Sequence, residues 1–249
     1  PDLEVFTDIA VPVEYYRDIM KRQAVVNPGV LFLLRDEQED GSFAEEQFYY
    51  EKGIEDYARE LLGDEEPLTP VQYWEAERVG RDREDKPDYK VKLSVALCFS
   101  NRVTITEYYH NSSFLEHGGS PERAVKAATV YQIDGYLKQN GKYLKNESKI
   151  TYQDVEDCLV LVSSSFSTQT SYENQTKKAI TNKFVYEAMN EFLRHRLEVY
   201  FIENPDDAAR ICEQVLINKR SRENAERTRL NLKKKLSGSI DLANRVQKF

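Results

Sequence analysis

The sequence predicts an α+β fold, in which helices cover an antiparallel or mixed sheet. Residues Asp88–Phe99 alternate between large apolar side chains and polar or small ones, as a strand with one solvent-facing side does. The short apolar run Cys158–Val162 is typical of a buried strand. Long helical patterns then begin near Thr181 and Asn204. Strands followed by helices indicate layers of the α+β kind.

Composition indicates a soluble globular protein. The 249 residues can bury a sizeable core as one or two domains, and 40% are hydrophobic while 31% are charged. No apolar run approaches the length of about 18 residues that marks a membrane span, and the start at Pro1 shows no signal peptide. We expect a cytoplasmic protein without membrane contact, excised from a longer chain. Cys98, Cys158 and Cys212 are expected to be reduced core residues, not metal ligands.

The formal net charge of −8 is unevenly distributed. From Asn204 to Phe249 there are 11 Lys and Arg against 6 Asp and Glu, a net of +5, so the other 203 residues carry −13. Thirteen acidic residues lie within Asp36–Glu66 alone. The average charge argues against a nucleic-acid partner, but it hides a basic C-terminal arm on an acidic body.

The first part of the chain predicts a helix, a hairpin and a second helix. Val13–Ala24 has a helical pattern, and Gly29–Leu34 and Gln47–Tyr50 indicate strands. The turn signal Asp40-Gly41 between these strands favours a hairpin. Gly53–Gly63 then indicates a helix that ends at a glycine.

The middle of the chain predicts two more strands and a helix after a glycine pair. Ser100–Arg102 can turn the strand Asp88–Phe99 into Val103–Tyr109, which would make an antiparallel pair. In Glu116–Tyr136, small residues recur at helical spacing. Gly118-Gly119 would supply unusual backbone angles there.

Local capping signals mark the starts of two helices. Ser120 can act as the N-cap of the helix in Glu116–Tyr136, and Pro121 suits its first position. Thr151–Asp154 is similar to a capping box, which predicts a short helix before the buried strand.

Two long helices are predicted at the C-terminal end. Thr181–Tyr200 carries a wide apolar stripe, and His195 within it is expected to have a structural or solvent-facing role. A second helix begins at Asn204 and continues to Leu236, although its apolar stripe fails beyond the first half. The second half should project from the domain, and Ser237–Ser239 should break the helix.

The polar loop Phe166–Asn182 is the candidate ligand-binding segment. It lies between the buried strand and a helix start, and it carries Lys177 and Lys178 in sequence. Ammonium groups and the free N–H groups of a helix start both favour an anion. From the residues alone, a solvated pair of lysines is the more frequent explanation of this pattern.

Six sequence blocks occur in an order that is similar to one protein family. They are YEKGIEDYARELLG (Tyr50–Gly63), PLTPVQYWEAER (Pro67–Arg78), EHGGS (Glu116–Ser120), ENQTKKAITNKFVYEAMNEFL (Glu173–Leu193), FIENPDDAARICEQVL (Phe201–Leu216) and the Arg-rich run that follows. Together they resemble the B subunit of bacterial type II DNA topoisomerases, either DNA gyrase or topoisomerase IV. The resemblance covers almost the whole chain and centres on the transducer domain, which joins the ATPase domain to the metal-binding Toprim domain.

The resemblance implies three parts. Residues 1–50 correspond to the C-terminal tail of a GHKL-type ATPase domain, residues 51–203 to the transducer domain, and residues 204–249 to a long exit helix and the connection towards Toprim. The implied transducer fold is a split β-α-β arrangement of the ribosomal-protein domain 2 type with a left-handed crossover. The nucleotide-binding motifs of the family lie upstream and have no counterpart in this sequence.

The resemblance also implies the site. Lys177 corresponds to the lysine of a Gln-Thr-Lys loop that contacts the γ-phosphate of ATP, and Gln175 and Thr176 accompany it. A cation there would stabilise charge that develops during hydrolysis. The implied cofactors are ATP and Mg²⁺ in the full-length protein, and the fragment alone is expected to bind neither and to be inactive. No metal site is expected within it. Lys178 has no implied role and is expected to be a solvated neighbour.

Double-stranded DNA is the implied macromolecular ligand, without sequence specificity. Lys126 aligns with a family arginine that faces the DNA-sized cavity of the dimer. The basic arm offers a phosphate-contacting surface, and its alternative is an exposed helix with local ion pairs to Glu223 and Glu226. The arm consists of Lys219, Arg220, Arg222, Arg227, Arg229, Lys233, Lys234 and Lys235.

The remaining implied partners are the topoisomerase A subunit and a second B subunit in a homodimer. An alternative interpretation is a binding or mechanical module of another GHKL ATPase, such as a mismatch-repair clamp or a heat-shock chaperone. The ENPDDA sequence that leads into the Arg-rich helix favours the topoisomerase.

Overall fold

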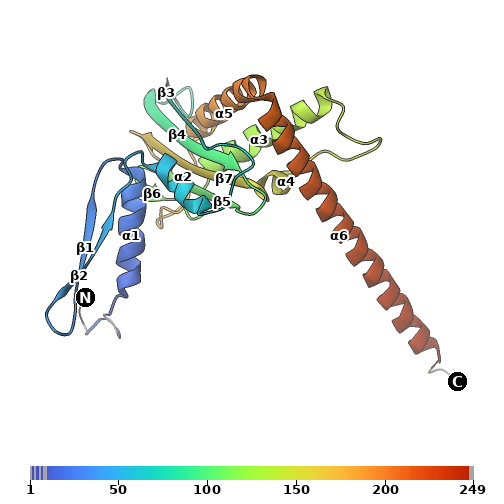
Figure 1. Cartoon of the computed structure of the whole chain (residues 1–249), viewed down its shortest axis with the longest axis horizontal. Coiled ribbons are helices and arrows are strands. Elements are labelled where there is room, and N and C mark those ends of the chain that lie inside the picture. Colours follow the sequence, from blue (N-terminus) through green and yellow to red (C-terminus); the bar gives the residue numbers. More distant parts are fainter. Residues whose placement is uncertain (1, 3, 6, 8–9, 247–249) are drawn as a thin grey trace.

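The computed structural model describes residues 2, 4–5, 7 and 10–246, with side chains up to Leu236. A five-stranded sheet and its helices form the body of the molecule (Figure 1). A helix and a two-stranded sheet extend from one side of this body, and a helix of 42 residues projects from the other. The predicted α+β class is confirmed.

The N-terminal part is a helix followed by a hairpin, as the sequence predicts. Helix α1 spans Val13–Val26, and the antiparallel strands β1 (Phe32–Glu37) and β2 (Phe43–Phe48) follow it. Strand β1 begins later than expected because the chain turns first. The turn is at Gly29, which has a φ of 76° and donates its N–H to the carbonyl of Tyr50 over 2.9 Å.

The main sheet has the strand order β3-β4-β7-β5-β6. The predicted pairing across Ser100–Arg102 is therefore wrong, because β7 lies between β4 and β5, antiparallel to the first and parallel to the second. Residues Leu159–Ser163 of β7 are all buried, which suits a central strand covered on both faces. The strands are β3 (Gln72–Gly80), β4 (Tyr89–Phe99), β5 (Ile105–His110), β6 (Ser113–Phe114) and β7 (Leu159–Ser167).

Helices cover both faces of this sheet. They are α2 (Ile54–Leu62), α3 (Ser120–Gln139), α4 (Tyr152–Glu156), α5 (Lys183–Glu203) and α6 (Pro205–Val246). The alternating apolar residues of β4 share one cluster with α3, α5 and the start of α6. On the other face, Ala96 and Cys98 are buried beside α2. The expected solvent-facing side of β4 therefore exists only in its first half, where Lys90 and Lys92 are exposed.

The capping predictions are confirmed at one helix and wrong at another. Thr151 and Asp154 form a capping box at the start of α4, as predicted. Gly119, not Ser120, is the N-cap of α3, and Ser120 already lies inside the helix, which has proline in its first turn. The backbone N–H of Ser120 donates to the carbonyl of Ile180, 2.9 Å away, so the loop before α5 takes part in holding this helix end.

The two C-terminal helices follow the sequence pattern with one exception. The predicted break at Ser237–Ser239 is wrong, since α6 continues as a helix to Val246. Its second half projects from the body as predicted (Figure 1). His195 of α5 is exposed, and Cys98, Cys158 and Cys212 are free and buried, all as predicted. Within the part of the chain that the structure describes, no helix combines the length and the apolar composition of a membrane span.

Candidate functional site

The loop between β7 and α5 folds into a short hairpin. The backbone N–H of Thr181 donates to the carbonyl of Ser171 over 2.8 Å, and the N–H of Glu173 donates to the carbonyl of Ala179 over 3.0 Å. The two legs of the hairpin are therefore paired, while residues 173–177 at its tip are exposed. The consecutive residues Gln175, Thr176 and Lys177 all lie at this exposed tip.

Asn174 organises the tip. Its side-chain oxygen accepts the backbone N–H of Thr176 over 3.1 Å and the hydroxyl of Thr176 over 2.5 Å, and its carbonyl accepts the N–H of Lys177 over 3.3 Å. An asparagine side chain bonded to the backbone two residues on is a turn of the kind that this residue favours. Lys177 has a φ of 57°, a left-handed conformation that is uncommon for lysine.

The ammonium of Lys177 lies near an aromatic ring of the same hairpin. It lies 5.6 Å from the centre of the Tyr172 ring, within the range of a cation–π contact. Among the described residues, no carboxylate forms an ion pair with it. Its neighbour Lys178 does form one, with Glu116, while its side chain stays 43% exposed, in keeping with the expected solvated position. This pairing lowers the pKa of Glu116.

The glycine pair before α3 supports the far leg of the hairpin. Gly118 and Gly119 have φ values of 57° and 86°, which confirms the predicted unusual backbone angles. Gly119 lies beside Ile180 in a parallel bridge, and a Cβ added at Gly119 would be only 2.3 Å from the carbonyl oxygen of Ile180. The close approach of two backbones therefore requires glycine here.

Two further side chains hold the base of the hairpin, and sequence reasoning did not identify them. The side-chain oxygen of Asn182 accepts the backbone N–H of Ser171 over 2.7 Å, and its amide nitrogen donates to Asp82 over 3.0 Å. Asp82, in the connection between β3 and β4, also accepts the backbone N–H of Phe184 over 2.8 Å in the first turn of α5. Only the pattern of a helix start near Thr181 hinted at Asn182; for Asp82 there was no local signal.

His110 is the third missed residue. It ends β5, is fully buried, and has both ring nitrogens within hydrogen-bond distance of hydroxyl groups at the end of β7 and the start of the loop. Burial lowers the pKa of His110 to about 4, so the ring is neutral near pH 7.

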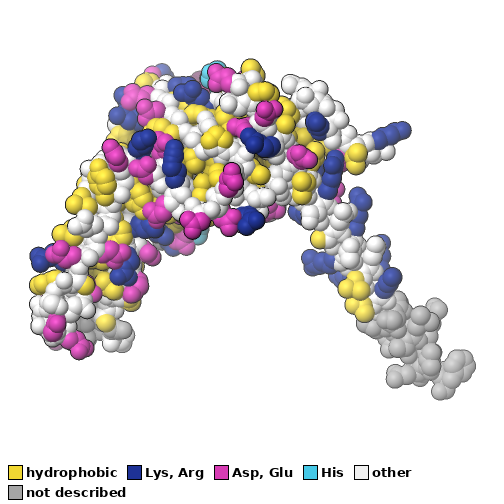
Figure 2. Space-filling model, viewed as in Figure 1, with side chains coloured by type: hydrophobic (Ala, Val, Ile, Leu, Met, Phe, Trp, Pro, Cys, Tyr) yellow, Lys and Arg dark blue, Asp and Glu magenta, His cyan; other side chains and the backbone are white. Residues whose placement is uncertain are grey.

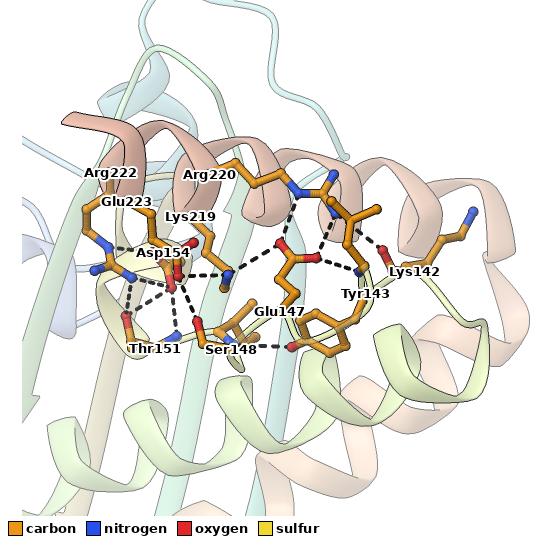
Figure 3. A network of polar contacts seen from close by, with 12 residues as sticks. Lys142, Tyr143, Glu147, Ser148, Thr151, Asp154, Lys219, Arg220, Arg222 and Glu223 are labelled. Carbon is orange, nitrogen blue, oxygen red and sulfur yellow. Dashed lines mark hydrogen bonds and ion pairs between the residues drawn. The ribbon is translucent and has the colours of Figure 1, made fainter. Parts of the chain in front are cut away.

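Lys219, Arg220 and Arg222 of α6 face the body and have acidic partners (Figure 3). The side chain of Lys219 is completely buried, with its ammonium 3.3 Å from Glu147 and 2.9 Å from Glu223. The guanidinium of Arg220 donates to both oxygens of Glu147 over 3.0 Å. Lys219 is thus unavailable to DNA, and its expected DNA-facing role is wrong.

Arg222 is similarly engaged with the body. Its guanidinium donates to the two carboxylate oxygens of Asp154 over 2.8 and 3.1 Å, and Asp154 is fully buried in the capping box of α4. Hydrogen bonds from Arg222 and from Thr151 lower the pKa of Asp154 against the opposing effect of burial. Paired charges consequently tie residues 219–222 of α6 to the segment 147–154.

The basic side chains of α6 from Arg227 to Lys235 are more exposed than those at 219–222. Arg227 and Arg229 are exposed, and Figure 2 shows Lys and Arg side chains along the projecting helix. Three exposed leucines accompany them: Leu230, Leu232 and Leu236. Lys126 on α3 is part-exposed, 2.8 Å from Glu122 and 5.0 Å from the centre of the Tyr152 ring, so its charge is partly compensated.

Comparison with known proteins identifies the family. The family model described as DNA gyrase B matches residues 53–231. The chain belongs to the DNA gyrase B family. The DNA gyrase B subunit of Metamycoplasma arthritidis is 30% identical over 239 residues, which cover 94% of this chain and 36% of that protein. Its counterpart in Mycoplasmoides gallisepticum is 26% identical over 228 residues, 91% of this chain and 35% of that protein. The chain spans about a third of the length of these relatives.

Two solved structures share the fold. The 43K ATPase domain of Thermus thermophilus gyrase B, determined in complex with an aminocoumarin, superposes with a TM-score of 0.66 at 21% identity, over 92% of this chain and 59% of that chain. The topoisomerase IV ATP-binding domain of Francisella tularensis superposes with a TM-score of 0.64 at 21% identity, over 89% of this chain and 57% of that chain.

Proposed function

We propose that this chain is the transducer region of the B subunit of an ATP-dependent type II DNA topoisomerase. Residues 1–50 would complete a GHKL-type ATPase domain, residues 51–203 would form the transducer with its split β-α-β arrangement, and residues 204–249 would lead towards the Toprim domain. In this proposal the loop with Gln175, Thr176 and Lys177 contacts the γ-phosphate of ATP, and α6 transmits the resulting motion.

The geometry of the loop tip is the observation that carries this proposal. Lys177 is exposed, adopts a left-handed backbone conformation and has no carboxylate partner among the described residues, whereas Lys178 next to it is paired. A strained, exposed and uncompensated cation on an otherwise well-anchored hairpin is available to an anionic ligand. The amide of Gln175 and the hydroxyl of Thr176 add donors that fit phosphoryl oxygens.

ATP with Mg²⁺ would supply the phosphoryl group, and the residues of this chain would bind and orient it. The ammonium of Lys177 would stabilise negative charge on the phosphoryl oxygens as the bond to the leaving group lengthens. When the phosphate departs, the tip loses its ligand, and the hairpin with the sheet behind it can take up a second position. Hydrolysis would thereby become a rigid-body motion of residues 51–203.

The charge network at the base of α6 suits the transmission of such a motion. Glu147 and Asp154 bind residues 219–222 of the helix to the body, so the body and the helix should move as one unit. A helix of 42 residues is about 60 Å long at 1.5 Å per residue. A small rotation of the body would then displace the far end of the helix by a much larger distance.

The partners of the whole protein follow from the family. We propose a topoisomerase A subunit, a second B subunit and double-stranded DNA without sequence specificity, all in the cytoplasm. Arg227 and Arg229, like Lys234 and Lys235 further along, are placed to contact DNA phosphates, because they are exposed on the projecting helix. Lys126, Arg220 and Arg222 each have an acidic partner, so a contact with DNA would have to compete with it.

Lys177→Ala in the intact B subunit tests the proposed function. ATP turnover should fall by about 10² or more, as on removal of a group that stabilises transition-state charge, while ATP binding largely survives. Lys183→Ala is the matched control, since Lys183 is an exposed lysine of the next helix that pairs with Glu187. Turnover and nucleotide affinity would be measured on the same preparations. Unchanged turnover in Lys177→Ala would remove the loop from the ATP site.

A further inference from the structure

The near leg of the hairpin, Thr168–Ser171, consists only of polar residues. The far leg is different, because Ala179 and Ile180 are buried and Ile180 contacts the backbone of Gly119. Burial of apolar surface therefore helps to hold the far leg. The near leg depends on hydrogen bonds, which fix direction as well as position.

His110 supplies several of those hydrogen bonds. Its Nδ1 lies 2.8 Å from the hydroxyl of Ser165 in β7, and its Nε2 lies 3.0 Å from the hydroxyl of Thr170 and 3.2 Å from that of Ser167. A neutral ring donates from one nitrogen and accepts at the other, and hydroxyls can match either role. The imidazole thus connects the end of the central strand to the leg that leaves it.

Asn111 binds the same segment through a second set of contacts. Its side chain accepts the backbone N–H of Ser167 over 2.9 Å and donates to the carbonyl of Ser167 over 3.0 Å. The same amide nitrogen lies 3.0 Å from the hydroxyl of Thr170. Asn111 has a φ of 47°, a conformation that asparagine tolerates better than most residues. Where β5 ends, the side chain of Asn111 takes the place of the backbone partner that a longer β5 would offer to β7.

We propose that His110 and Asn111 are positioning residues, which clamp Ser167 and Thr170 and thereby set the place of Lys177. The inference rests on the proposed function of the loop. Neither residue would touch the nucleotide, because His110 is fully buried and both act on the stem of the hairpin. Their effect on turnover would pass through Lys177, since a displaced cation stabilises the developing charge less well.

Thr170→Val is the most informative variant. It keeps the shape of the side chain but removes the hydroxyl that His110 and Asn111 share, and because Thr170 is only partly buried the fold should tolerate the change. Thr168→Val is the matched control, as it makes the same substitution at an exposed position of the same leg. Each would be made in the intact B subunit, alone and together with Lys177→Ala.

We expect Thr170→Val to lower ATP turnover about tenfold, with ATP affinity changed less than about twofold, and Thr168→Val to behave as the unmodified protein. In the Lys177→Ala background, Thr170→Val should lower the residual turnover no further, because a residue that acts through Lys177 has nothing left to position. Equal fractional losses in both backgrounds, or no loss in either, would overturn the inference.

Amide hydrogen exchange of residues 171–181 gives a readout that does not depend on turnover. Exchange should accelerate in Thr170→Val and His110→Ala relative to Thr168→Val, and unchanged exchange would contradict the clamp. The two proposals can fail separately. If Lys177→Ala keeps full turnover, the proposed function fails whatever the exchange shows. If Lys177→Ala loses turnover while Thr170→Val changes neither turnover nor exchange, only the clamp fails.

Discussion

The ammonium of Lys219 is completely buried and lies 3.3 Å from a carboxylate oxygen of Glu147, whose own side chain is only 7% exposed. Glu147 also accepts two hydrogen bonds from Arg220, and these contribute most to lowering its pKa to about 2. A buried charge pair requires such additional bonds to offset the loss of hydration. The pair joins the segment before α4 to the projecting helix α6.

Removal of one charge from this pair should destabilise the protein. Glu147→Gln keeps the shape and part of the hydrogen bonding but leaves the buried ammonium of Lys219 with less compensation, which should cost about 3 kcal/mol of unfolding free energy. Glu226→Gln, at an exposed position of the same helix, should change it by less than about 0.5 kcal/mol. Denaturant unfolding of the two variants measures the difference. Equal stabilities would show that the pair does not hold the helix.

Stability should also depend on pH through His110. Its pKa is lowered from 6.5 to about 4 by burial, so the folded state holds the neutral ring. The unfolded chain binds the proton more readily, so the stability present above about pH 6.5 should be lost as the pH falls through about 4. The loss should reach about 3 kcal/mol. Unfolding curves between pH 7 and pH 4 would be compared with those of His110→Gln, whose curve should fall less steeply in this window.

Gly119→Ala should disturb both stability and the loop. The added methyl group would approach the Ile180 carbonyl to 2.3 Å, and the φ of 86° disfavours any side chain. Gly141→Ala is the control, because Gly141 has a φ of 59° but open space around it. The control should cost about 1 kcal/mol, and Gly119→Ala clearly more. Equal losses of unfolding free energy in the two variants would contradict a close contact at Gly119.

DNA-binding measurements should distinguish the exposed arginines of the basic arm from those that are paired with the body. Replacing Arg227 and Arg229 together by Ala should weaken DNA binding at every sequence and reduce the slope of log affinity against log salt by about 2. Arg222→Ala should instead act mainly on stability, because it leaves the buried carboxylate of Asp154 without its cationic partner. A salt series with the intact protein and an arbitrary duplex measures both slopes. A larger slope change in Arg222→Ala would reverse this assignment.

Many elements of this fold can be read from local sequence. The apolar stripes of α5 and the first half of α6, the glycine that ends α2 and the capping box at Thr151 each act within a few residues, so a sequence window contains the whole cause. The grouping of Gln175, Thr176 and Lys177 at one loop tip is equally local. The family was also evident from ordered sequence blocks.

Tertiary structure alone decided what depends on distant partners. The apolar run of β7 indicated a buried strand, but only packing on both faces placed it between β4 and β5 and overturned their predicted pairing. The charge run on α6 could not show that Lys219 is buried against Glu147, 72 residues away. His110 and Asp82 had no local signal, because their hydrogen-bond partners are supplied by segments brought together only when the sheet forms. A sequence pattern shows which side chains can be buried on one face of an element, whereas the fold determines which distant residues pack against that face.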